Sequence, residues 1–297
     1  MAIGWYPGHM HKARNDITQA LKGVDAVLEL VDARLPYASE NPLLNRLIGS
    51  LKRLRLMTKA DLADPAITKM WEEHYAKQGI STLLVEKDDQ KIAKQILNFL
   101  HAELPPRTSR PNRVMIVGIP NVGKSTLTNL LAQRKLAKVG NEPAVTKAKQ
   151  EIRLSADLVL LDTPGILWPK LEDQQAAYRL AASGAIRNTA IDLADIGLFT
   201  AGFLAQRYPT VLRERYGIEK LDVENVELLE AIGRRRGCLV RGGVDLTKAG
   251  EALVQDLRSG KLGRISLETP DDIPPPPQEI AEPESAPASP SLCEEQR

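Results

Sequence analysis

The chain has 297 residues, of which 43% are hydrophobic and 26% are charged, with a formal net charge of +2. This composition excludes an intrinsically disordered protein and suits one large domain or two moderate ones. Apolar runs stay far below the 18 residues of a membrane span and the N-terminus does not read as an export signal, so we expect a soluble cytoplasmic protein. The two cysteines, Cys238 and Cys293, suggest neither a disulfide framework nor a metal centre.

Charge is unevenly distributed along the chain. Residues 268–297 hold eight acids and one arginine, a net charge of −7, which leaves +9 for residues 1–267. The same stretch has eight prolines and few large apolar side chains, and we therefore expect a disordered acidic tail. The basic body points to a polyanionic partner, although an ordinary soluble surface also explains so modest an excess.

Strand-like and helical patterns alternate in the first 105 residues. After an amphipathic helix over residues 10–24, we expect strands at 26–31, 53–57 and 81–85 and helices at 41–50, 64–78 and 90–104. Asp64 and Pro65 form the start signal of the second of these helices. Such alternation predicts a parallel sheet covered by helices.

The second half of the chain continues this pattern and then changes it. A linker at 105–112 precedes a strand at 114–119, a helix at 124–136 and a strand pair at 151–155 and 158–162. Beyond residue 171 the periodicity is helical, at 176–186, 201–217, 226–237 and 248–262. We expect an α/β domain over residues 1–171, a small all-helical domain over 172–267 and the tail over 268–297.

The segment GIPNVGKS, Gly118–Ser125, satisfies the phosphate-loop pattern G-x-x-x-x-G-K-[ST] between a predicted strand and a predicted helix. Backbone N–H groups at the helix N-terminus would surround the phosphates. The Lys124 ammonium would lie between the β- and γ-phosphates, and the Ser125 hydroxyl would bind Mg²⁺. The predicted contacts of this loop are Asn121, Val122, Gly123, Lys124, Ser125 and Thr126.

A second motif, LVLLDTPG, ends a predicted strand at Asp162. Its carboxylate would support Mg²⁺ from the second shell, and the Gly165 N–H would sense the γ-phosphate. Thr146 lies where a loop could cover Mg²⁺ in the triphosphate state. The two motifs together predict a P-loop nucleoside triphosphatase.

The run TKAD, at Thr58, Lys59, Ala60 and Asp61, follows another predicted strand. A carboxylate at Asp61 can accept both donors of the guanine edge, N1–H and the 2-amino group, while the stem of Lys59 covers the ring. In an ordinary GTPase this element follows the phosphate loop, whereas here it precedes it. A circular permutation, in which residues 26–104 form the later half of the sheet and 113–165 the earlier half, accommodates every element.

These motifs resemble the YlqF/RbgA type of circularly permuted ribosome-biogenesis GTPases. The resemblance rests on WYPGHMHKA at Trp5, ELVDARLPYASENP at Glu29, TKAD, the phosphate loop, LLDTPGILWPKLED at Leu160, LAASGAI at Leu180 and AIGRRRGCLVRGG at Ala231. It implies a GTP-hydrolysing switch that binds GTP and GDP with Mg²⁺. The implied partners are an immature large ribosomal subunit and its rRNA, with no membrane or DNA partner, and we expect a monomer.

Three positions depart from the family pattern. Thr58 stands where the family usually has Asn, although its hydroxyl can still bond locally. Glu86 and Lys87 occupy the place of a small polar pair that approaches guanine O6. Ala144 replaces a usual glycine before Thr146 and should stiffen that loop.

The residues after Gly165 are Ile166, Leu167 and Trp168, none of which can orient the attacking water. The resemblance points instead to His9 as the catalytic group. It also implies that Asn121 helps to hold K⁺ beside the phosphates, where an arginine finger would otherwise act. A turnover that is the same in Na⁺ and K⁺ would contradict this second role.

Residues 231–267 contain eight basic and three acidic side chains. The resemblance implies contact with rRNA phosphates through Arg234, Arg235, Arg236 and Arg241. Alternatively, these arginines have only a structural role, as cations in the last turn of a helix that interact favourably with its dipole. Two other functions stay open: an RNA-binding scaffold that holds GTP structurally, and a P-loop kinase for a small molecule. The kinase leaves Asp61 without a role.

Overall fold

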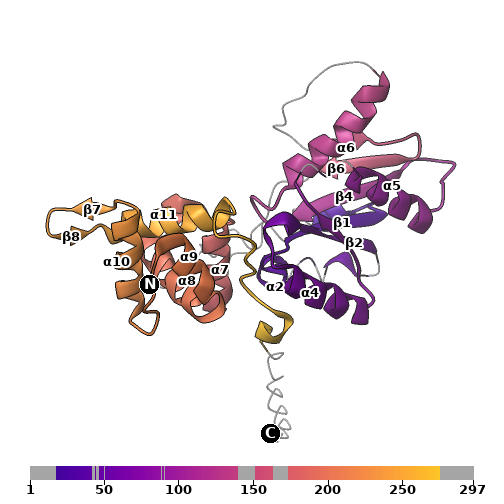
Figure 1. The fold of residues 1–297 in the computed structure, drawn as a ribbon. Coiled ribbons are helices and arrows are strands. Elements are labelled where there is room, and N and C mark those ends of the chain that lie inside the picture. Colours follow the sequence, from indigo (N-terminus) through magenta and orange to yellow (C-terminus); the bar gives the residue numbers. More distant parts are fainter. Residues whose placement is uncertain are drawn as a thin grey trace, which may run out of the picture.

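The structure is a computed structural model that describes residues 18–41, 44, 47–49, 51–87, 89, 91–139, 151–162 and 173–274. An α/β domain comes first in the chain and a mainly helical domain follows it (Figure 1). Within these residues, no helix is long and apolar enough to cross a membrane.

A six-stranded sheet forms the centre of the α/β domain. Its strands are β1 (Ala26–Asp32), β2 (Lys52–Thr58), β3 (Ser81–Val85), β4 (Asn112–Gly118), β5 (Glu151–Arg153) and β6 (Leu158–Asp162), in the order β3-β2-β1-β4-β6-β5. All neighbours are parallel except β5, which runs antiparallel to β6. The predicted mostly parallel α/β sheet is confirmed. Strand β1, from the segment before the linker at 105–112, pairs with β4, which follows that linker, as the permutation requires.

Helices connect these strands. They are α2 (Pro36–Ser39), the 3-10 turn η1 (Ala60–Leu62), α4 (Pro65–Lys77), α5 (Ile92–Glu103) and α6 (Lys124–Val139). The predicted start of α4 is confirmed, because the Asp64 carboxylate accepts hydrogen bonds from the N–H groups of Ala66 and Ile67.

Alternate residues of the central strands pack on opposite faces of the sheet. Leu28 and Leu30 of β1 join the cluster that includes α5, whereas Val31 packs with Trp71 and Tyr75 of α4. Both faces are therefore buried, and this explains why the strands appear as continuous apolar runs in the sequence.

One buried position in β1 is charged. Glu29 is 1% exposed and accepts hydrogen bonds from Arg53 and from Arg55 of the neighbouring strand. Arg55 also pairs with Glu40 at 2.9 Å and lies over the Tyr75 ring. The charge is tolerated because it has partners of opposite sign within hydrogen-bonding distance.

The second domain contains α7 (Gln174–Ser183), η2 (Asn188–Ala190), α8 (Leu193–Arg207), α9 (Pro209–Tyr216), α10 (Asn225–Arg235) and α11 (Leu246–Arg258). The helical pattern over 201–217 is divided at Pro209, which starts α9 because proline cannot continue a hydrogen-bonded helix. The expectation of an all-helical domain needs one correction. A short hairpin, β7 (Leu239–Val240) with β8 (Gly243–Val244), lies between α10 and α11, and Gly242 at φ +101° allows the chain to reverse.

The predicted boundary at residue 268 also needs correction. After α11 the chain returns to the α/β domain, and Figure 1 shows this yellow segment passing close to α2 and α4. Glu268 is 2% exposed and accepts a hydrogen bond from the Ala38 N–H, and η3 (Pro270–Asp272) follows it. Residues 268–273 are therefore ordered, because these contacts repay the ordering entropy of the segment. We call residues 259–268 the return segment.

Candidate nucleotide-binding site

The loops that leave β1, β2 and β4 converge at one edge of the sheet. Because β1 is parallel to both neighbours, the carboxyl ends of all three strands lie together, which is where ligands bind in open α/β sheets. The register pairs Asp32 with Thr58 and Leu30 with Gly118. The phosphate loop and the TKAD element therefore leave the sheet side by side.

A direct contact joins the two motifs. The Thr58 hydroxyl lies 2.7 Å from the carbonyl oxygen of Val122, 64 residues later in the chain, and 3.0 Å from that of Val31. Its single proton can be donated to either oxygen. The side chain is 4% exposed, so this local bonding is shielded from water. The TKAD element and the phosphate loop, whose order in the chain is the reverse of that in an ordinary GTPase, thus lie together in the fold.

The phosphate loop depends on two glycines. A Cβ on Gly118 would lie 2.7 Å from the carbonyl oxygen of Leu30, so the close approach of β1 excludes any larger residue. Gly123 has φ +108°, which L side chains rarely adopt. Helix α6 begins directly after it, and Ser125 and Thr126 are exposed in its first turn. The loop therefore presents a helix N-terminus to the sheet edge, where anions are favoured.

The Lys124 side chain lies within the phosphate loop. Its ammonium donates hydrogen bonds to the carbonyl oxygens of Gly118 at 3.0 Å and Ile119 at 2.6 Å, and the residue is 8% exposed. Burial lowers the pKa of Lys124 to about 8, although the negative charge of Asp162 at the end of β6 opposes this shift. A phosphate group would supply the compensating negative charge.

Lys59 is held beside the end of β1. Its backbone has the left-handed conformation, with φ 57°, and its ammonium lies 2.8 Å from Oδ2 of Asp32. The same carboxylate accepts two hydrogen bonds from Arg34, at 2.9 and 2.8 Å. Burial acts to raise the pKa of Asp32, but the charges of Arg34 and Lys59 outweigh it and keep this pKa well below its usual range. An ionised Asp32 thus fixes Lys59.

Asp61 lies in η1 and is partly exposed. Its Oδ1 accepts a hydrogen bond of 3.2 Å from the backbone N–H of Lys87, so the segment after β3 adjoins it. Glu86 and Lys87 are both exposed there. Asp61 also acts on buried Arg34. The charges of Asp32 and Asp61 raise the pKa of Arg34, although burial acts to lower it.

The C-terminal end of α7 reaches the same loops. The Asn121 amide donates a hydrogen bond of 2.9 Å to the carbonyl oxygen of Gly184, and Arg34 donates one of 3.2 Å to that of Ser183. Asp32 and Arg34 were not predicted from the sequence as site residues. Asp32 ends a buried strand and Arg34 follows it, next to the TKAD strand, and this position is the signal that could have identified them.

Three predicted site residues, His9, Thr146 and Gly165, lie outside the described residues. Of the remaining set, Ala60 is buried in η1, and its carbonyl oxygen faces the return segment. Asp162 ends β6, next but one to β1 in the sheet. The described residues that are expected around a nucleotide therefore come from loops at a shared edge, and the Thr58–Val122 contact links the loop of Asp61 to the loop of Lys124.

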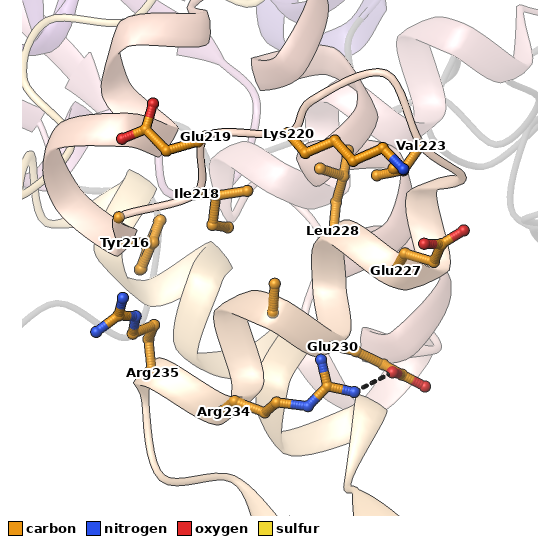
Figure 2. Close-up of a pocket in the computed structure, with 12 residues that line it drawn as sticks. Tyr216, Ile218, Glu219, Lys220, Val223, Glu227, Leu228, Glu230, Arg234 and Arg235 are labelled. Carbon is orange, nitrogen blue, oxygen red and sulfur yellow. Dashed lines mark hydrogen bonds and ion pairs between the residues drawn. The ribbon is translucent and has the colours of Figure 1, made fainter.

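The predicted RNA-binding arginines lie in the helical domain, away from the sheet. Arg234 and Arg235 line a concavity of about 510 Å³ together with Lys220 and three glutamates (Figure 2). Arg234 is bonded to Glu230 at 2.6 Å, and its side chain is 60% exposed. Arg236 lies 3.5 Å from buried Asp256 and so has a structural partner, whereas Arg241 is exposed in the hairpin turn.

This combination of sheet order, phosphate loop and guanine-type loop defines a circularly permuted P-loop GTPase. A family model described as "50S ribosome-binding GTPase" matches residues 113–230. The "Ribosome biogenesis GTPase A" of Priestia megaterium is 44% identical over 283 residues, covering 92% of this chain and 98% of that protein. The chain therefore belongs to the ribosome biogenesis GTPase A family.

Solved structures agree with this assignment. The GNP-bound YlqF of T. maritima is 31% identical, with a TM-score of 0.66 over 88% of this chain and 100% of that chain. The GDP-bound YlqF structure is 29% identical, with a TM-score of 0.65 over 86% of this chain and 100% of that chain.

Proposed function

We propose that this chain is a GTP-hydrolysing switch that binds an immature large ribosomal subunit through rRNA and leaves after hydrolysis. Membership of the ribosome biogenesis GTPase A family supports this function. The observation that carries it is the Thr58–Val122 contact, which holds the TKAD loop beside the phosphate loop, so that one nucleotide could bind to both. A role in ribosome assembly would place the protein in the cytoplasm.

The base would be read by Asp61 and covered by Lys59. A carboxylate can accept the N1–H and the 2-amino protons of guanine, and adenine offers no such pair. The Asp32–Lys59 contact would hold the lysine stem beside the loop and so lower the ordering cost of binding.

The phosphates would lie on the loop around Lys124. Binding would return an anionic partner to a buried ammonium whose pKa is depressed. The exposed Ser125 hydroxyl at the start of α6 and the Asp162 carboxylate suit Mg²⁺, which prefers oxygen ligands and keeps several waters. Mg²⁺ would neutralise charge that develops on the phosphates.

Water activation is assigned to His9, and Thr146 and Gly165 would respond to the γ-phosphate. Asn121 is proposed to help hold K⁺. Its amide nitrogen donates to Gly184 and its side-chain oxygen would serve the cation, so the same residue would link the cation site to the helical domain.

The conformational signal would pass through α7. The segment after Asp162 leads directly to this helix, and the end of α7 already contacts Arg34 and Asn121. A change at the phosphates could therefore reorient the helical domain relative to the sheet.

Arg234, Arg235 and Arg241 would meet rRNA phosphates at the far end of this domain, with Arg236 contributing its exposed part. Figure 1 places α10 and the β7–β8 hairpin on the side away from the sheet. Arg234→Glu with Arg235→Glu should abolish most binding to large-subunit particles, and the affinity of the unchanged protein should fall steeply with salt. Arg213→Glu is the matched control, since Arg213 is an exposed arginine of α9 in the same domain.

The experiment is co-sedimentation with ribosomal fractions in GTP, GDP and a non-hydrolysable GTP analogue, with hydrolysis measured alongside. We expect the analogue to retain the protein on large-subunit particles and GDP to release it, and large subunits to accelerate hydrolysis. Binding that ignores the nucleotide, with hydrolysis that ignores the subunit, would favour the scaffold with structural GTP. ATP competing as well as GTP would favour the kinase.

A further inference from the structure

The return segment is bonded along the loop that carries Asp61. The Arg264 guanidinium donates to the carbonyl oxygens of Ala63 and Ala60, both at 2.8 Å. The next residue, Ile265, donates its N–H to the carbonyl oxygen of Leu62 at 2.9 Å. Two side-chain bonds and one backbone bond from adjacent residues therefore reach the single turn Ala60–Ala63.

This turn has little internal support. It is one turn of 3-10 helix, with Leu62 N–H bonded to Lys59 at 2.9 Å and Ala63 N–H bonded to Ala60 at 3.3 Å. Short 3-10 turns have poor hydrogen-bond geometry, and Lys59 before it holds an unfavourable left-handed conformation. External bonds are therefore needed to fix the direction in which Asp61 points.

Arginine suits this task better than lysine. Its planar guanidinium presents two donors at a fixed separation, so it can hold the oxygens of residues 60 and 63 at one distance from each other. Asp61 lies between these two residues in the chain. Any change in that distance would rotate the Asp61 backbone and displace the carboxylate.

We propose that Arg264 is a positioning residue for guanine recognition. It touches no base and acts through the carbonyl oxygens of Ala60 and Ala63, so the segment that follows α11 contributes to the choice of nucleotide. The inference rests on the proposed function, in which Asp61 reads guanine. The effect concerns the base alone, and GDP and GTP should therefore respond equally.

The test compares the affinities for GDP and for inosine diphosphate, which lacks the 2-amino group that Asp61 would bind. Arg264→Gln should weaken GDP binding by about tenfold and inosine diphosphate binding by less, because misplacing the carboxylate affects two contacts in one ligand and one in the other. Arg264→Lys should have a GDP affinity between those of the unchanged protein and Arg264→Gln. Arg213→Gln makes the same chemical change at an exposed site of the helical domain and should match the unchanged protein.

A second measurement separates positioning from general destabilisation. In an Asp61→Asn background, Arg264→Gln should cost little further GDP affinity, since the carboxylate that it orients is gone. An unchanged preference for GDP over inosine diphosphate in Arg264→Gln, or an equal loss in both backgrounds, would overturn the inference. Thermal unfolding monitors the fold, and Arg264→Lys decides the question if the glutamine variant does not fold.

The proposed guanine function and the role of Arg264 can be overturned separately. If the unchanged protein binds ADP as tightly as GDP, the proposed guanine function fails and the role of Arg264 fails with it. If the unchanged protein prefers GDP and Arg264→Gln keeps the whole preference, only the role of Arg264 is lost.

Discussion

Nucleotide affinity should fall as the pH rises above 7, and Lys124 is the cause. Its ammonium is 8% exposed, and burial lowers its pKa to about 8, whereas bound phosphates would favour the charged form and raise that pKa. With a pKa of about 8, roughly nine-tenths of the free protein carries the proton at pH 7 and about a quarter at pH 8.5. Affinity should therefore fall about fourfold between these two pH values, by the same linkage.

Fluorescent GDP titrated at pH 7 and pH 8.5 measures this change. Calorimetry in two buffers of different ionisation enthalpy should detect an uptake of about three-quarters of a proton per nucleotide at pH 8.5 and about 0.1 at pH 7. Lys124→Gln should bind more weakly and lose the Lys124 part of the pH dependence, whereas Lys69→Gln, at an exposed position of α4, should keep it. The same pH dependence in Lys124→Gln would refute the reasoning.

The stability of the ligand-free protein should change in the opposite direction. Below pH 8 Lys124 is protonated in both the folded and the unfolded chain. Between about 8 and the ordinary value of 10.5, the unfolded chain keeps a proton that the folded chain has released. Stability should therefore rise with pH through this window as far as Lys124 is concerned, and Lys124→Gln should remove that contribution.

Two further predictions concern acidic residues. Asp61→Asn should weaken GTP by roughly 2–4 kcal/mol, because a charged two-proton acceptor is lost, and should improve xanthosine triphosphate relative to GTP; a competition assay in which xanthosine triphosphate gains nothing would contradict the role of Asp61. Burial raises the pKa of Glu268 to about 8 from its ordinary 4.5, although hydrogen bonding by Ala38 and the charge of Arg179 oppose this. Between pH 4.5 and about 8 this carboxyl is ionised only in the unfolded chain, so the free energy of unfolding should fall as the pH rises. Urea unfolding at pH 5 and pH 8 should show a smaller fall in Glu268→Gln than in the unchanged protein. An equal fall in both would exclude Glu268 as the source.

The ends of the strands illustrate how far sequence reasoning reaches. The GIPNVGKS and TKAD motifs each follow an apolar run, and the carboxyl ends of parallel strands meet at one edge, so their convergence was predictable from order and periodicity. At this edge the Thr58 hydroxyl bonds to the Val122 carbonyl oxygen and so links the two loops directly. The geometry of this bond was not predictable, because the loop conformation depends on glycine dihedral angles and on the approach of β1.

The charged residues Glu29, Asp32 and Arg34 mark the limit of that reasoning. In the sequence these charged residues interrupt, end or follow an apolar strand and suggest positions exposed to solvent, yet each is about 1% exposed. Their burial is possible only because Arg55, Lys59 and each other lie within hydrogen-bonding distance. No local pattern encodes partners that come from neighbouring strands.

Local patterns by themselves predicted the six strands of the sheet, most of the helices, the phosphate loop and the permuted order, because backbone propensity, apolar periodicity and glycine positions act over a few residues. The tertiary structure alone decided that the segment after α11 comes back to hold the Asp61 turn, and that the end of α7 meets the phosphate loop. These contacts join residues about 60 to 200 positions apart, and they form only when the packed domains bring their backbone groups together.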